Sequence, residues 1–111
     1  MNFFFSLIFL FISLLACQRA GSEKKHSVLE QKGKAVYISQ CVVCHNINPT
    51  LPGSVGPEIA NSSLELIRAR VMTATYPTNY KPKRQSRVML AFPYLEKDIP
   101  ALHAYLNSFK K

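Results

Sequence analysis

Residues 41–45 read Cys41-Val42-Val43-Cys44-His45 in a chain of 111 residues. This stretch places two thiols three positions apart and an imidazole directly after the second thiol. A chain of this length has room for one small domain, whose hydrophobic core alone supplies little stability. We therefore expect a disulfide, a metal or a large apolar cofactor to complete the core, and the pentapeptide carries the chemistry for each of these.

The spacing of the two cysteines and the histidine is typical of covalent haem attachment. Two thiols at this spacing meet the two vinyl groups of a haem, and the histidine then falls beneath the iron. The sequence therefore predicts one haem c per chain, attached at Cys41 and Cys44 and ligated by His45. A thiol redox motif, which expects a preceding strand, remains an alternative, as do a short-loop disulfide and a zinc site. A zinc site needs a fourth ligand, and His26 and His103 lie outside finger-like spacing.

Residues 1–17 form an apolar run that is short for a permanent bilayer span and is typical of a signal peptide. Its end, Leu14-Leu15-Ala16-Cys17, resembles a bacterial lipoprotein box, in which the cysteine is acylated and becomes the mature N-terminus. No Lys or Arg precedes the run, and Leu15 is bulky for such a box, so ordinary cleavage or an uncleaved anchor stays open. Residues 18–27 are polar and suit a flexible tether. We expect an exported, periplasmic domain at residues 28–111, held at the membrane by lipid on Cys17.

Helical signals dominate the remainder of the chain. A capping-box pattern, Ser27 with Glu30, opens a helix that leads into Cys41, and a second pattern, Ser62–Glu65, opens a helix that ends before Pro77. No stretch alternates with period two, so we expect an all-α domain with about three main helices and long loops. The apolar positions that share a side are Leu29, Gly33, Val36 and Tyr37 in the first helix, Leu64, Ile67 and Val71 in the second, and Leu95, Ile99, Leu102, Leu106 and Phe109 in the third, which has Pro100 in its first turn.

From about residue 33 to residue 108 the sequence resembles the small class I c-type cytochromes. Gly33-x-x-x-Tyr37-x-x-x-Cys41 is similar to the family's N-terminal helix, whose glycine lets the C-terminal helix cross closely. Tyr105 matches the aromatic residue that packs at this crossing in the family. The resemblance implies a cytochrome c-like fold around a covalently bound haem.

The same resemblance implies further roles at the haem. Gly56-Pro57 is similar to the family's Gly-Pro, and the Pro57 carbonyl would accept the second N–H of the ligating histidine. Met89 lies just before the last helix, where the family carries its axial methionine, and is the expected sixth ligand. Met72 on the second helix is the competitor and has the character of a core residue. Pro93 follows Met89 by four residues, which departs from the closer proline of the family.

An iron ligated by His45 and Met89 has no open position for a substrate, which favours electron transfer over catalysis. The chain also lacks a glycine-rich phosphate loop, paired carboxylates and a nucleophile with an obvious base, so we expect no enzymatic activity. The leading expectation is an electron carrier that shuttles between respiratory-type complexes outside the cytoplasmic membrane. The alternatives are a haem-based ligand sensor, which requires Met89 to be displaced, and a non-catalytic haem subunit of an oxidoreductase complex.

Fourteen Lys and Arg residues against six Asp and Glu give a formal net charge of +8. No acidic residue lies between Glu65 and Glu96. A basic surface beside the haem would steer the protein onto the acidic docking face of a redox partner. A solvated loop and attraction to an anionic membrane are the other interpretations, and the export signal counts against nucleic acid. The basic residues of this interval are Arg68, Arg70, Lys81, Lys83, Arg84 and Arg87.

Overall fold

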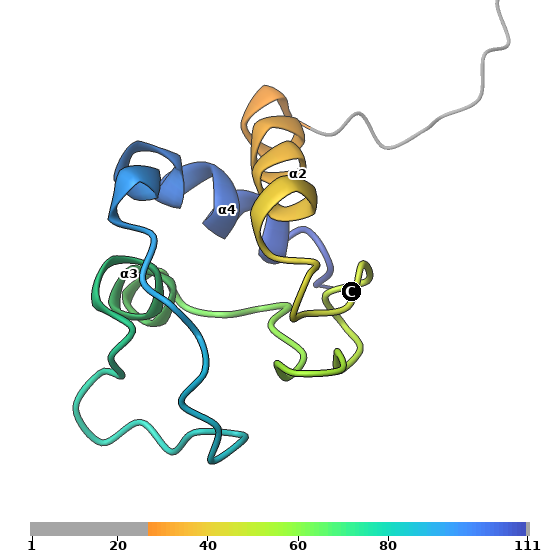
Figure 1. Ribbon diagram of the computed structural model, residues 1–111. Coiled ribbons are helices and arrows are strands. Elements are labelled where there is room, and N and C mark those ends of the chain that lie inside the picture. The colour runs from red at the N-terminus through yellow and green to blue at the C-terminus, as the bar shows by residue number, and fades with distance from the viewer. Residues whose placement is uncertain (1–26, 111) are drawn as a thin grey trace, which may run out of the picture.

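The computed structural model describes residues 27–110, which form three α-helices and one 3-10 helix joined by long irregular segments (Figure 1). Helix α2 spans Val28–Gln40, α3 spans Leu64–Thr73, and α4 spans Ile99–Leu106. The 3-10 helix η1 spans Pro93–Asp98 and runs directly into α4. No strand occurs within residues 27–110, so the expected all-α architecture is confirmed.

The signal peptide, the lipidated cysteine and the tether were expected at the N-terminus. The signal peptide expected at residues 1–17, the lipidated Cys17 and the tether up to residue 26 lie outside the described residues. Among the helices of residues 27–110, none has the length and apolar character needed to cross a membrane.

Helices α2 and α3 each begin at a serine N-cap. The Glu30 N–H donates to Ser27 Oγ at 3.1 Å, as the first capping pattern predicts. The second pattern is wrong by one residue, because Ser63 caps α3 and accepts the Leu66 N–H at 3.1 Å. Ser62 instead donates its hydroxyl to the Ile59 carbonyl at 2.7 Å. Adjacent serines offer the same cap chemistry, and the turn that follows Ile59 decides which of them is used.

Helices α2 and α4 pack against each other closely at Gly33 (Figure 1). A Cβ atom on Gly33 would lie 2.8 Å from Tyr105 Cβ and would overlap the Ala101 carbonyl. One turn along α2, the fully buried Tyr37 packs its ring on Tyr105 with centroids 5.5 Å apart. The Tyr37 hydroxyl donates to the Asn46 carbonyl, so the crossing also holds the loop that follows α2.

We expect Gly33→Ala to lower the free energy of unfolding by about 1–3 kcal/mol, because the new methyl group meets the α4 backbone. The sign of this change distinguishes the two effects, since helix propensity alone would make the alanine variant more stable by about 1 kcal/mol. Denaturant unfolding of the full chain measures the change. Lys34→Ala, on the exposed neighbouring position, is the control and should leave stability nearly unchanged. An unchanged or raised stability for Gly33→Ala would contradict the close crossing.

The core lies where α2, α3, η1 and α4 meet. Its apolar residues come from all four elements, but two expected members, Leu29 and Leu64, are 47% and 43% exposed. Both lie in the first turn of their helices, and α4 is only eight residues long, so it does not cover these ends. The buried core consists of Tyr37, Ile67, Val71, Leu95, Ile99, Leu102, Tyr105 and Leu106, with Val36, Met72, Phe92 and Phe109 packed against it.

Candidate cofactor-binding site

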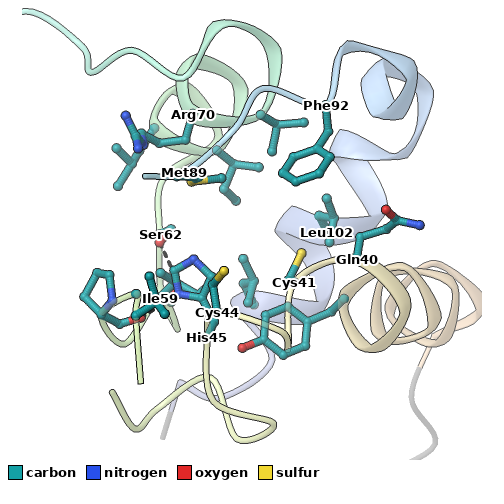
Figure 2. Close-up of a pocket in the computed structure, with 18 of the residues that line it drawn as sticks. Gln40, Cys41, Cys44, His45, Ile59, Ser62, Arg70, Met89, Phe92 and Leu102 are labelled. Carbon is teal, nitrogen blue, oxygen red and sulfur yellow. Dashed lines mark hydrogen bonds between the residues drawn. The ribbon is translucent and has the colours of Figure 1, made fainter. Parts of the chain in front are cut away.

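A pocket of about 390 Å³ opens beside the core, between the loop that follows α2 and the segment that precedes η1. Its volume lies in the range of about 300–1,000 Å³ that small-molecule and cofactor sites occupy. Figure 2 shows Cys41, Cys44 and His45 on one side of the pocket and Met89 on the opposite side. The aliphatic and phenylalanine side chains of the lining are Val43, Val55, Ile59, Leu66, Ile67, Val71, Val88, Leu90, Phe92, Leu95, Leu102 and Leu106.

The two cysteines reach the pocket because the chain turns sharply where α2 ends. The Cys41 N–H donates to the Tyr37 carbonyl at 2.9 Å, and the His45 N–H donates to the Cys41 carbonyl at 2.9 Å. Cys41 and Cys44 form no disulfide, and both line the pocket. Burial raises the pKa of the Cys41 thiol to about 11, and the neighbouring Cys44 acts in the same direction. A raised pKa and a preceding helix both differ from a thiol redox motif, whose reactive cysteine has a lowered pKa.

The His45 ring is held from behind by the chain itself. Its Nδ1 lies 2.8 Å from the Pro57 carbonyl oxygen, the contact that the resemblance implies. Because a carbonyl only accepts, Nδ1 carries the proton and Nε2 keeps its lone pair. Burial lowers the pKa of His45, and the positive charges of Arg84 and Arg70 act in the same direction, whereas the Pro57 hydrogen bond opposes them. The imidazole is therefore neutral near pH 7, the form that binds a metal.

The turn formed by residues 53–58 packs directly on this histidine. The Gly56 N–H donates to the Cys44 carbonyl at 2.8 Å, and the Gly53 N–H donates to the Gly56 carbonyl at 2.9 Å. A Cβ atom on Gly56 would lie 2.6 Å from His45 Nδ1. Glycine at this position therefore allows the 53–58 turn to approach the ring closely enough for the Pro57 contact.

The two candidate methionines lie in different surroundings. Met89 is half-buried, lines the pocket and belongs to a segment without helix or strand. Met72 lies on α3, is packed against the core and is not part of the pocket lining. Between Met89 and Pro93 the chain is bonded to α3, because the Phe92 N–H donates to the Val71 carbonyl at 2.6 Å.

Sequence reasoning missed an aromatic group on the pocket wall. The Arg70 guanidinium lies 4.1 Å from the Tyr76 ring centroid, and Tyr76 stacks on Tyr80 with centroids 5.4 Å apart. Both tyrosines line the pocket. Tyr76 and Tyr80 lie on an irregular segment, where no periodic pattern predicts which way a side chain points. The one signal in the sequence was an arginine, Arg70, followed by two tyrosines four residues apart, which can stack on each other and on a guanidinium.

Among the described residues, His45 is the one histidine that lines the pocket. His103 is half-buried on α4 and is not part of the lining, and His26 lies outside the described residues. Within residues 27–110, no group of three or more His, Cys, Asp or Glu side chains is arranged to hold a metal ion, which is what a zinc site needs.

The side chains around the pocket fit a haem. The His45 imidazole and the Met89 thioether, on opposite walls, are the two kinds of side chain that would hold the iron of a porphyrin. Two thiols on one wall and an apolar lining complete the set. Comparisons of the chain with protein-family models, with curated proteins and with solved structures found no match.

Proposed function

We propose that the chain is a small c-type cytochrome with a cytochrome c-like fold, and that it carries electrons on one covalently bound haem. The observation that carries the proposal is the placement of His45 and Met89 across an apolar pocket from each other, with Cys41 and Cys44 beside the histidine. Each of these residues alone has other uses. Their convergence on one pocket of cofactor size supports haem binding.

In this proposal each residue has a defined task. Cys41 and Cys44 would hold the haem by addition of each S–H across one vinyl group, and the Pro57 carbonyl holds His45 in the tautomer that leaves its other nitrogen free for iron. Met89 supplies a thioether, which together with the apolar wall favours the ferrous over the ferric state. When bound, haem supplies a one-electron change between these two states. His45 and Met89 would together hold the iron and leave no position for a substrate, which supports a carrier rather than an enzyme.

The proposed setting rests on the N-terminal sequence and on charge. Residues 1–17 support export to the periplasm, and lipid on Cys17 would tether the domain to the membrane. The net charge of +8 supports docking onto redox proteins with an acidic face, between which the domain shuttles electrons. Exchange with such a partner should slow as salt rises, and rates indifferent to salt would contradict the docking part of the proposal.

The experiment is expression of the full chain in cells that attach haem c, followed by denaturing electrophoresis and visible spectroscopy. We expect haem to stay with the polypeptide after denaturation, because thioether bonds survive it. We also expect reversible one-electron reduction, with a methionine-to-iron charge-transfer band in the ferric protein. A polypeptide that loses its haem on denaturation, or never acquires it, would refute the proposal.

A further inference from the structure

The segment that carries Met89 has few contacts of its own. Within the part of the chain that the structure describes, residues 85–91 make a single hydrogen bond, from the Val88 N–H to Ser86 Oγ at 3.4 Å. A segment of this kind is positioned by its ends. The Met89 segment, defined here as residues 84–92, ends at Phe92, whose N–H is bonded to the Val71 carbonyl of α3.

The other end of the Met89 segment is bound to the 53–58 turn. The Arg84 guanidinium donates to the Gly53 carbonyl at 3.0 Å, and Lys83 Nζ donates to the Glu58 carbonyl at 2.9 Å. Lys83 Nζ also lies 3.1 Å from the Glu58 carboxylate. These contacts join residues 25 and 31 positions apart in the chain. Two residues of the basic interval therefore bind another segment of the same chain.

The 53–58 turn is the same turn that holds His45. Pro57, between Gly53 and Glu58, accepts the Nδ1 hydrogen bond of His45, and Gly56 packs on the ring. The 53–58 turn therefore contacts His45 on one wall of the pocket and the start of the Met89 segment on the other. We propose that Arg84, assisted by Lys83, is a positioning residue that holds Met89 at its distance from His45 by anchoring the Met89 segment to the 53–58 turn. This inference rests on the proposed haem site.

The two contacts differ in strength. The Lys83 and Glu58 side chains are 44% and 42% exposed, and an ion pair with this exposure contributes little and weakens in salt. The Arg84 contact is half-buried and joins a charged donor to a backbone carbonyl, which is among the stronger hydrogen bonds. Arg84 is therefore the principal anchor.

The test compares Arg84→Met with Arg87→Met in the full, haem-loaded chain. Both variants remove one positive charge from the same segment, but Arg87 is exposed and makes no hydrogen bond or ion pair with the described residues. The readout is the affinity of the ferric protein for imidazole, which has to displace Met89 and abolishes the methionine-to-iron band. We expect Arg84→Met to bind imidazole about tenfold more tightly than the wild type, because a loosened Met89 competes less well. Arg87→Met should match the wild type.

Lysine variants extend the test, because they keep the positive charge that the methionine variants remove. Arg84→Lys keeps a donor at the position and should give a smaller increase than Arg84→Met, whereas Arg87→Lys should give none. If Arg84→Met does not retain haem, this lysine pair decides. Equal imidazole affinities within each pair would overturn the assignment of Arg84. The proposed function fails separately, if the wild type itself shows neither covalent haem nor the methionine band.

Discussion

Replacing Cys41 and Cys44 together by alanine should abolish covalent haem attachment and leave a chain that does not fold stably. The described core is small, and it surrounds a pocket of about 390 Å³ that its own side chains do not fill. Without a bound cofactor, the apolar lining of this open pocket would face water, and the small core would lose the contacts that the cofactor supplies. A typical domain is stable by only about 5–15 kcal/mol, so a small domain has little reserve against this loss.

Circular dichroism, protease resistance and haem staining after denaturing electrophoresis measure this outcome on the full chain. Each single variant, Cys41→Ala or Cys44→Ala, keeps one thioether and should retain covalent haem in reduced yield. Val43→Ala is the matched control, because Val43 lies between the cysteines and is 80% exposed. Recovery of the double variant as a soluble, cooperatively folded protein without haem would show that the core is sufficient without the cofactor.

Replacing Met89 by alanine should remove the methionine-to-iron band and open a position at the iron. We expect the reduction potential to fall by on the order of 0.1 V, within the ~0.8 V range that axial ligands span. Carbon monoxide should then bind the reduced variant readily, while the wild type binds it poorly. The physical reason is that Met89 occupies the pocket wall opposite His45.

Met72→Ala is the control for this experiment. Met72 packs against the core outside the pocket lining, so its loss should lower the unfolding free energy by about 1–2 kcal/mol and leave the band in place. Loss of the band in Met72→Ala alone would move the sixth ligand to α3. Ready binding of carbon monoxide by the wild type would instead favour a ligand sensor over a carrier.

Local sequence patterns predicted the helices well and their edges less well. Spacing of apolar residues identified all three α-helices, and Pro100 falls in the first turn of α4 as expected. Leu95 and Phe109, expected on the last helix, lie outside α4, because Pro93–Asp98 form a 3-10 helix and α4 ends at Leu106. The cap of α3 moved from Ser62 to Ser63, and Leu29 and Leu64 remain half-exposed. Periodicity reports which side of a helix is apolar, but it does not report how far a neighbouring helix extends over that side.

The basic interval illustrates a second limit. Its charges predicted a surface for partners, yet Arg70 donates to the Ala74 carbonyl, and Lys83 and Arg84 bind the 53–58 turn. A count of charged residues does not show which of them are hydrogen-bonded. Every residue has a backbone carbonyl, so the sequence does not show which carbonyls accept hydrogen bonds from basic side chains. Arg68, Lys81 and Arg87 are exposed and make no hydrogen bond or ion pair with the described residues, whereas Lys83 is exposed but paired with Glu58.

The sequence by itself determined the all-α class and the set of reactive groups, because helical periodicity and the cysteine and histidine spacing are local properties. Two thiols and an imidazole within five residues converge whatever the rest of the chain does. Only the tertiary structure decided that Met89 lines the pocket while Met72 does not, and that His45 and Arg84 both donate to the 53–58 turn. Those relations join residues tens of positions apart, and packing of α2, α3 and α4 establishes them rather than any local preference.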